Sequence, residues 1–155
     1  MKIALIASEV TPFAKTGGLA DVLGSLSAVL EQLGHEVFVI APAYSTVLRG
    51  GFGLHDAMQF SVPVGDRAMP AEVLQSLIGN RTTIYFIRAD QYFDREFLYS
   101  TPTGDYPDNS ERFVFFSRAA LELLQHRPAD IVHCHDWQTA LVTVYLRTQA
   151  ARYSE

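Results

Sequence analysis

The first 41 residues contain the pattern that most restricts what this chain can fold into. Residues 2–7 are a short, continuously apolar run, which is typical of a strand covered on both faces of a parallel sheet. After a loop, apolar side chains recur at intervals of three and four, which predicts a helix from Leu19 that ends at Gly34. Residues 36–41 repeat the buried-strand pattern, so the segments predict a β-α-β unit with a right-handed crossover. The expected core face of the helix is Leu19, Val22, Leu23, Leu26, Val29, Leu30 and Leu33.

The middle of the chain has a different pattern of apolar residues. Residues 58–64, 68–78 and 82–88 are strand-like runs separated by the turn signals Gly65-Asp66 and Gly79-Asn80, which predicts an antiparallel hairpin insertion. Residues 90–107 form a long aromatic stretch that contains proline, and loops of this length inside a compact domain are commonly functional.

The last third of the chain returns to alternating helix and strand. Asp108 and Glu111 are spaced like a capping box, which predicts the start of a helix, and residues 131–135 and 139–147 predict a strand and a further helix. The expected inner face of the first of these helices is Phe113, Phe116, Ala120, Leu123 and Leu124. The predicted fold class is therefore α/β, a Rossmann-like doubly wound and mostly parallel sheet with the hairpin insertion.

Length and charge narrow the classes of protein. The chain has 155 residues, 48% of them apolar, which suits one domain with a real core, and no linker divides it. Seventeen acidic against twelve basic residues give a net charge of -5 with no basic stripe, so nucleic-acid and membrane-surface binding are not expected. Residues 151–155 follow the last helix without closing the sheet, and we interpret this as a truncation.

Targeting signals are not evident in the sequence. The first apolar run is too short for a signal peptide, and no stretch approaches the roughly 18 apolar residues of a membrane span. Cys134 is the only cysteine, which excludes an intramolecular disulfide and suits a reducing compartment. A cytoplasmic location is expected, or a plastid if the source is a plant and a transit peptide has been removed.

A polar loop precedes the first helix, where unbonded backbone amides favour an anion. Lys15, Thr16, Gly17 and Gly18 lie there, and glycines let the backbone approach a phosphate closely while the lysine adds positive charge. The spacing matches neither a Walker loop nor a dinucleotide-binding motif. From spacing alone, a plain turn with a solvated lysine is an equal interpretation.

A second polar segment ends the strand at residues 131–135. His133, Cys134, His135 and Asp136 suggest a metal, but only the two imidazoles share a face and no further ligands at a zinc-like spacing are evident. Metal is therefore not expected. We expect His135 and Asp136 to bind polyol hydroxyls at the crevice, with a core histidine and a helix-capping aspartate as the alternative.

Three further groups of residues are candidates on weaker grounds. Glu9 follows the first strand and faces the same crevice, or is an ordinary loop carboxylate. Arg95 and Arg112 are interpreted as structural ion-pair partners. Aromatic residues that either stack on sugar rings or pack in the core are Tyr92, Phe93, Phe97, Tyr99 and Tyr106.

Long stretches of the chain resemble bacterial glycogen synthases and plant starch synthases. The opening Met-Lys-Ile-Ala-Leu-Ile-Ala-Ser-Glu-Val-Thr-Pro-Phe-Ala-Lys-Thr-Gly-Gly-Leu-Ala-Asp-Val is similar to the N-terminal signature of that family. The similarity continues through Tyr-Phe-Asp-Arg at residues 92–95, Gly-Asp-Tyr-Pro-Asp-Asn at residues 104–109, and His-Cys-His-Asp-Trp-Gln-Thr at residues 133–139.

The resemblance implies a retaining GT-B glycosyltransferase of two Rossmann-like domains, of which this chain is the N-terminal, acceptor-side one. Such enzymes transfer glucose from ADP-glucose to the non-reducing end of an α-1,4-glucan without a metal or other cofactor. Implied contacts to the donor diphosphate are Lys15, Gly17, Gly18 and Asp21. Implied residues on the glucose and acceptor side are Glu9, Phe93, His135 and Asp136, the last in a supporting catalytic role. Several bacterial members have tyrosine where this chain has Phe93.

The same resemblance implies that essential parts are absent from these 155 residues. The family's Thr-x-His-Asn segment and its C-terminal nucleotide-sugar domain are not present, so the chain by itself is expected to be inactive. A relative that uses UDP-glucose or makes a short maltosaccharide, and a non-catalytic module that binds glucan or nucleotide, remain alternatives.

Overall fold

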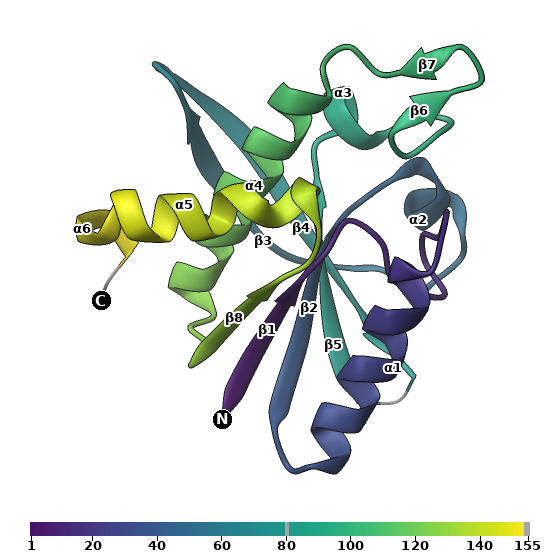
Figure 1. Cartoon of the computed structure of the whole chain (residues 1–155), viewed down its shortest axis with the longest axis vertical. Coiled ribbons are helices and arrows are strands. Elements are labelled where there is room, and N and C mark those ends of the chain that lie inside the picture. Colours follow the sequence, from purple (N-terminus) through teal and green to yellow (C-terminus); the bar gives the residue numbers. More distant parts are fainter. Residues whose placement is uncertain (80, 154–155) are drawn as a thin grey trace.

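A computed structural model describes residues 1–79 and 81–153 of the chain and shows a six-stranded sheet in the order β3-β4-β5-β2-β1-β8 (Figure 1). The strands of this sheet are β1 Lys2–Ile6, β2 Glu36–Pro42, β3 His55–Val64, β4 Arg67–Ile78, β5 Thr82–Arg88 and β8 Ile131–Cys134. The helices are α1 Leu19–Gln32, α2 Ser45–Arg49, α3 Asp90–Phe93, α4 Asn109–His126, α5 Ala140–Thr148 and α6 Ala150–Tyr153.

The predicted β-α-β unit is present and occupies the centre of the sheet. β1 pairs in parallel with β2 on one side and with β8 on the other, so Ile6 lies opposite both Ile40 and Cys134. α1 joins β1 to β2, and Gly34 follows it with φ 87°, a conformation that glycine adopts without strain. The mostly parallel α/β fold class is confirmed.

α1 covers the sheet with a narrower face than its sequence suggested. Its buried residues are Ala20, Leu23 and Ser27, and Leu26 and Leu30 are partly buried. Of the expected core residues, Val22 is 53% exposed and Leu33 is 68% exposed. The apolar positions span a wide arc of the helix, and periodicity alone does not tell which part of that arc meets the sheet.

The two faces of the sheet are covered by different helices. Tyr85 and Phe86 are neighbours on β5 and therefore point to opposite faces. The Tyr85 hydroxyl accepts a hydrogen bond from Arg127 Nε, just after α4, at 3.2 Å. The Phe86 ring packs on Phe13, in the loop before α1, with centroids 5.0 Å apart. Both faces of the parallel strands are thus buried, as their continuous apolar runs predicted.

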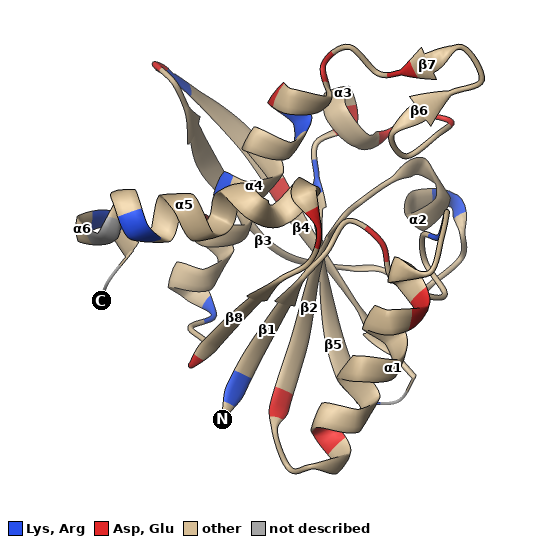
Figure 2. Ribbon diagram, viewed as in Figure 1, with Lys and Arg blue, Asp and Glu red and all other residues tan. Residues whose placement is uncertain are grey.

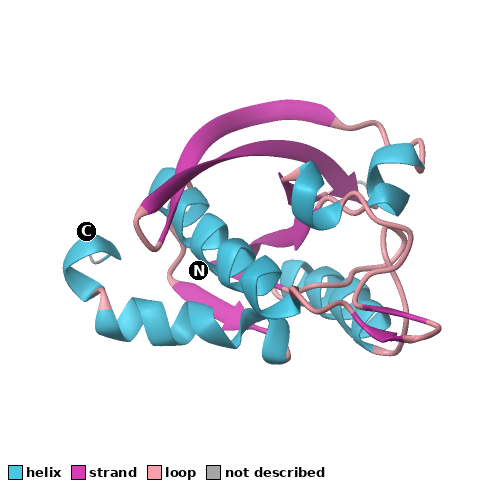
Figure 3. Cartoon of the chain, turned by 90° about the horizontal axis from the view of Figure 1, so that it is seen from above, coloured by secondary structure: helices cyan, strands magenta, loops and turns pink. Residues whose placement is uncertain are grey.

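The predicted antiparallel pairing of the three runs is present, and the third run is in addition part of the parallel sheet. β3 and β4 pair antiparallel around a turn in which Gly65 has φ 59°, and these long strands arch over α4 (Figure 3). β5 is antiparallel to β4 but parallel to β2, so it belongs to the parallel sheet itself. The apolar pattern of β5 does not indicate which strands it pairs with, because strand pairing is decided by the tertiary structure. Asn80, in the second predicted turn, lies outside the described residues.

Residues 90–107 contain α3 and a small hairpin of β6 Ser100–Thr101 and β7 Gly104–Asp105, and they run directly into α4. α4 starts where expected, but the capping box does not form. No side chain caps the helix at Asp108, whose carboxylate instead pairs with Arg95, while Glu111 Oε1 accepts a hydrogen bond from the Tyr92 hydroxyl at 2.6 Å. Four of the five expected inner residues are buried, and Leu124 is partly buried.

Charges are scattered singly over the molecule rather than gathered in a basic stripe (Figure 2). Within residues 1–79 and 81–153, no helix is both long enough and apolar enough to cross a membrane.

The central position of β1 leads to a stability prediction. Leu5 is fully buried between β2 and β8, so Leu5→Ala should lower the free energy of unfolding by about 2–5 kcal/mol through lost burial and a cavity. Leu77→Ala, on β4 and 50% exposed, should change it by less than about 0.5 kcal/mol. Urea denaturation of both variants measures the difference, and equal midpoints would contradict the central placement of β1.

Candidate functional site

The carboxyl ends of β1 and β8 form the topological switch point of the sheet. The connection from β1 leads to β2 on one side, whereas β8, which the chain enters from β5, lies on the other side of β1. Crevices outside such points are the usual ligand sites of open α/β sheets. The structure brings the loop after β1 and residues 135–139 together here, since His135 N donates to Ile6 O at 3.0 Å. Trp137, 52% exposed, adds its ring to this edge.

Glu9 is buried at the base of the loop that follows β1, with 4% of its surface exposed. Its Oε2 accepts hydrogen bonds from Thr16 N at 2.5 Å and Gly17 N at 3.3 Å. Its Oε1 accepts from Thr16 Oγ1 at 2.6 Å and lies 2.9 Å from the Tyr99 hydroxyl. The carboxylate therefore binds the polar loop from below instead of facing the open crevice.

Lys15 and Asp21 form an ion pair above that loop. Lys15 Nζ lies 2.7 Å from Asp21 Oδ2 and 2.8 Å from Oδ1, and both side chains are about half exposed. The hydrogen bond from Lys15, and then that from Thr11, hold the pKa of Asp21 below its usual value. Asp21 is therefore ionised at neutral pH and holds Lys15 at the start of α1.

The backbone at the N-terminus of α1 is open. Gly18 is the N-cap residue, and no side-chain hydrogen bond caps the helix. A Cβ built on Gly17 or Gly18 would meet nothing within 4 Å, and neither residue has a positive φ. Neither packing nor the left-handed conformation therefore explains these glycines. The uncapped start of α1 and the open space at Gly17 and Gly18 lie at the positive end of the helix dipole, which is a geometry that suits an anion.

Asp136 has a strained backbone at the tip of β8. Its φ of 63° and ψ of 179° lie in a region that is essentially restricted to glycine. Its Oδ1 accepts a hydrogen bond from Trp137 N at 2.7 Å, which caps the 3-10 turn η1 Trp137–Thr139. The capping role, which was the alternative interpretation, is therefore present, and the carboxylate remains exposed. Strain of this kind concentrates at functional sites.

His135 lies below Asp136, half-buried against His133, with ring centroids 4.2 Å apart. Burial, and then the charge of His133, lower the pKa of His135 below its usual value of 6.5. Its Nε2 is buried, and none of the described residues offers it a hydrogen-bond partner. Burial raises the pKa of the Cys134 thiol to about 11, so Cys134 stays protonated. In the described ranges no three His, Cys, Asp or Glu side chains are placed to hold a metal ion, and a metal-free site stays a prediction.

Phe93 is placed differently from the other candidates. Its side chain is fully buried in an aromatic cluster and packs on Tyr44, Phe113, Phe115 and Phe116. A direct contact between Phe93 and a sugar does not fit this burial, because the ring has no free surface. Phe93 instead supports the segment around α3 from within. Tyr92 is buried beside it, while Phe97 is partly exposed.

The two arginines expected to form ion pairs differ. Arg95 pairs with Asp108, as expected. Arg112 is fully buried with no carboxylate partner among the described residues, which corrects the ion-pair interpretation. It donates from Nε to Tyr92 O at 2.8 Å and from Nη1 to Asn109 Oδ1 at 2.7 Å. Burial lowers the pKa of Arg112 below its usual value.

The sequence did not indicate that Tyr99 and Thr16 both donate hydrogen bonds to Glu9, nor that Ser8 lies beside them. Tyr99 reaches across ninety positions in sequence to Glu9, and its hydroxyl also lies 2.7 Å from Ser8 Oγ. Burial raises the pKa of Tyr99 well above its usual value, so it stays a phenol. No local pattern pairs these residues, because the aromatic stretch and the polar loop become neighbours only through the sheet.

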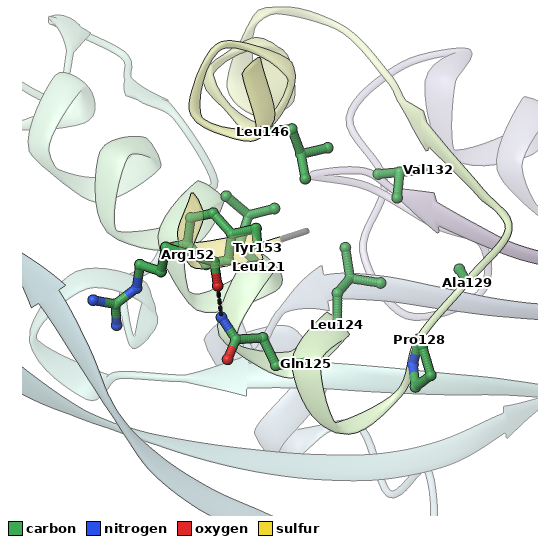
Figure 4. A pocket seen from close by; sticks show the side chains of 9 residues that line it. All are labelled: Leu121, Leu124, Gln125, Pro128, Ala129, Val132, Leu146, Arg152 and Tyr153. Carbon is green, nitrogen blue, oxygen red and sulfur yellow. Dashed lines mark hydrogen bonds between the residues drawn. The ribbon is translucent and has the colours of Figure 1, made fainter. Parts of the chain in front are cut away.

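A groove of about 300 Å³ with a mixed polar and apolar lining lies elsewhere, between α4, β8, α5 and α6 (Figure 4). It is lined by Leu121, Leu124, Gln125, Pro128, Ala129, Val132, Leu146, Arg152 and Tyr153. Pro128 and Ala129 precede β8, so the groove is at the amino end of that strand, away from the crevice.

Comparison with known proteins agrees with this geometry. A family model described as the starch synthase catalytic domain matches residues 2–155. The chain belongs to this family. Among curated relatives, the glycogen synthase of Geotalea uraniireducens is 47% identical over 96% of this chain, and glycogen synthase 2 of Geobacter sulfurreducens is 43% identical over 97%.

A solved structure from the same family has the same fold. The catalytic domain of starch synthase IV from Arabidopsis thaliana, bound to ADP and acarbose, superposes with a TM-score of 0.83 at 30% identity over 97% of this chain. The chain spans 31% of that structure, and 31% and 32% of the two bacterial relatives. The resemblance seen in the sequence is thereby confirmed at the level of family and fold.

The buried His135 predicts an acid-sensitive stability. Its folded pKa lies below 6.5, so as pH falls through 6.5 the unfolded state takes up a proton that the folded state does not. The free energy of unfolding should therefore decrease between pH 7.5 and 5.5, a window above the titration of ordinary carboxylates. Urea midpoints should fall less over this window in His135→Gln than in the wild type. An equally steep slope in His135→Gln would contradict the assignment.

Proposed function

We propose that this chain is the N-terminal, acceptor-side domain of a retaining glycosyltransferase that transfers glucose from ADP-glucose to the non-reducing end of an α-1,4-glucan. The observation that carries the proposal is the open, uncapped N-terminus of α1, with Gly17, Gly18 and Lys15, at the switch point of a chain from the starch synthase family. The solved relative bound to ADP and acarbose, a nucleotide and a sugar ligand, supports both halves of this assignment.

On the donor side, we assign the diphosphate to Lys15, Gly18 and the first turn of α1. Gly17 was expected to donate its amide to the diphosphate, but that amide points to Glu9, so Gly17 contributes open space beside the ligand. The Lys15–Asp21 pair is exposed and therefore weak, and Lys15 can exchange the carboxylate for a diphosphate. Asp21 then lies close to the donor and sets the resting position of the lysine.

On the glucose and acceptor side, we assign Asp136 with His135. Asp136 presents a carboxylate at the crevice from a strained backbone, which fixes the direction of the side chain. His135 is held neutral by burial and supplies a hydrogen-bonding ring behind it. Their task is to orient sugar hydroxyls, and no metal or other cofactor is required by this arrangement.

We propose that the complete enzyme has a second, C-terminal domain that closes over this crevice in a GT-B architecture. The chain spans about 31% of the length of its bacterial relatives, which leaves room for such a domain. Positive groups from that domain would neutralise the leaving diphosphate and exclude water, the largest electrostatic contributions to a transfer of this kind. The choice between ADP-glucose and UDP-glucose, and between polymer and short maltosaccharide, belongs to those groups.

The relatives also bear on location. The bacterial relatives reported above are 43–47% identical to this chain, whereas the plant structure is 30% identical. This difference favours a bacterial cytoplasmic enzyme over a plastid one.

Replacing Lys15 tests the donor assignment. In the complete enzyme, Lys15→Ala should weaken the use of ADP-glucose by about 1–3 kcal/mol, the scale of a contact to a charged partner, seen as a lower kcat/KM at limiting donor. Lys2→Ala is the matched control, because Lys2 lies at the amino end of β1 and, within the part of the chain that the structure describes, its side chain forms an ion pair only with Glu36, at 3.9 Å. Unchanged donor kinetics in Lys15→Ala would overturn the assignment.

The 155-residue chain alone should transfer no glucose. Without a second domain, its few phosphate contacts hold the donor only weakly and leave it in water. The test incubates labelled ADP-glucose and glycogen with the isolated chain beside the complete enzyme. Polymer labelling by the chain at a few per cent of the complete enzyme's rate would mean that the catalytic groups lie within these residues. Donor binding by the complete protein without any turnover would instead favour the binding-module alternative.

A further inference from the structure

The Glu9 carboxylate is held by hydrogen bonds from the polar loop and from Tyr99. Both carboxylate oxygens accept hydrogen bonds from Thr16, one from its amide and one from its hydroxyl. Gly17 N and the Tyr99 hydroxyl complete the set, and the side chain is 4% exposed. In the described ranges no basic group lies within ion-pair distance of Glu9. A buried carboxylate of this kind depends on its donors, because its charge is costly without them.

The Tyr99 hydroxyl has a single proton, which fixes its role. It lies 2.9 Å from the Glu9 carboxylate and 2.7 Å from Ser8 Oγ. The carboxylate can only accept, so Tyr99 donates to Glu9 and accepts from the Ser8 hydroxyl. Ser8 is fully buried beside it. Among the described residues, Tyr99 is thus the one donor to Glu9 that comes from outside the β1–α1 connection.

Tyr99 is itself fixed from the opposite side. Its carbonyl accepts hydrogen bonds from Asn109 Nδ2 at 2.9 Å and from Tyr106 N at 3.0 Å. The other end of the Asn109 amide accepts from the buried Arg112, which also holds the carbonyl of Tyr92. Arg112 therefore ties both ends of residues 92–99 to α4, directly at one end and through Asn109 at the other.

We propose that Glu9 and Tyr99 are positioning residues that hold the Lys15-Thr16-Gly17-Gly18 loop in its donor-binding position. We name this contact the Glu9–Tyr99 latch. This inference rests on the proposed function for the part that concerns the donor, whereas the anchoring of the loop stands on the contacts alone. It also moves Glu9 from the acceptor side, where the resemblance placed it, to support of the donor side.

Geometry favours this role over a contact with glucan. A sugar hydroxyl needs a free lone pair and access, and the Glu9 oxygens already accept four hydrogen bonds below the loop. Thr16 and Gly17 amides that point down to Glu9 leave the Gly18 amide and the first turn of α1 facing outward. Loss of the latch should release the loop, so that the Thr16 and Gly17 amides no longer point consistently to Glu9.

Hydrogen exchange in the complete protein tests the anchoring. Tyr99→Phe removes the hydroxyl but keeps the ring, so the Thr16 and Gly17 amides should exchange on the order of tenfold faster, as expected when one hydrogen bond to a charged group is lost from a locally opening segment. Tyr92→Phe is the matched control, since its hydroxyl bonds Glu111 and not Glu9, and loop exchange should stay at the wild-type rate. Unchanged exchange of these amides in Tyr99→Phe would overturn the latch.

A second pair of variants approaches the same carboxylate from the loop. Thr16→Val removes one donor to Glu9 and should also accelerate exchange of the Gly17 amide, whereas Thr16→Ser keeps the hydroxyl and should restore the wild-type rate. This pair decides the question even if Tyr99→Phe folds poorly. Equal exchange in the valine and serine variants would overturn the anchoring role of Glu9.

Steady-state kinetics of the complete enzyme separate the latch from the proposed function. Tyr99→Phe should raise the KM for ADP-glucose roughly fivefold or more, while kcat and the KM for glycogen stay near wild type. A rise confined to the glycogen KM would overturn the inference, because Glu9 and Tyr99 would then act on the acceptor. Faster loop exchange with an unchanged donor KM would uphold the anchoring and count against the donor role proposed for the loop.

Discussion

The position of β1 is the constraint on which the rest of this structure depends. It is hydrogen-bonded along both edges, to β2 and to β8, and its residues from Ile3 to Ala7 are buried. A strand in the middle of a parallel sheet cannot shift register without moving both neighbours. The carboxyl end of β1 therefore fixes the position of Ser8 and Glu9. These residues lie at the point where the connection to β2 and the connection into β8 lead to opposite sides of β1. The crevice exists because of that divergence.

Two buried charged side chains lie below the crevice, and each is held by hydrogen bonds, with no opposite charge within ion-pair distance among residues 1–79 and 81–153. Glu9 accepts from the polar loop and Tyr99, and Arg112 donates to Tyr92 and Asn109. Arg112 is further surrounded by rings, with its guanidinium carbon 5.1 Å from the Tyr106 centroid and 5.6 Å from that of Phe93. Residues 90–107, which were predicted to be a functional loop, contact the β1–α1 loop through the hydrogen bond from the Tyr99 hydroxyl to Glu9.

Much of the fold follows from local pattern. The strand, helix and strand of the first unit, the start of α4 and the strand before His135 all match their predicted places, because burial on both faces or on one helical face leaves a regular apolar period. The position of the polar loop directly before α1 was also predictable, since glycines and a lysine at a helix N-terminus act through local backbone geometry. The roles of Glu9, Phe93 and Arg112 could not be predicted from the sequence, because each depends on a partner far away in sequence.

The sequence by itself determined the α/β class, the central β-α-β unit, the family and the polar segments that meet at the crevice. Only the tertiary structure decided that β5 joins β2 in parallel, that Phe93 is enclosed, that Arg112 bonds Tyr92 O and Asn109 and that Glu9 faces Thr16 and Tyr99. The physical reason is the distance along the chain over which each kind of interaction acts. Periodicity and turn chemistry act over a few residues, whereas the partner of a buried charge is chosen by how the strands and helices pack, and Tyr99 lies ninety residues from Glu9.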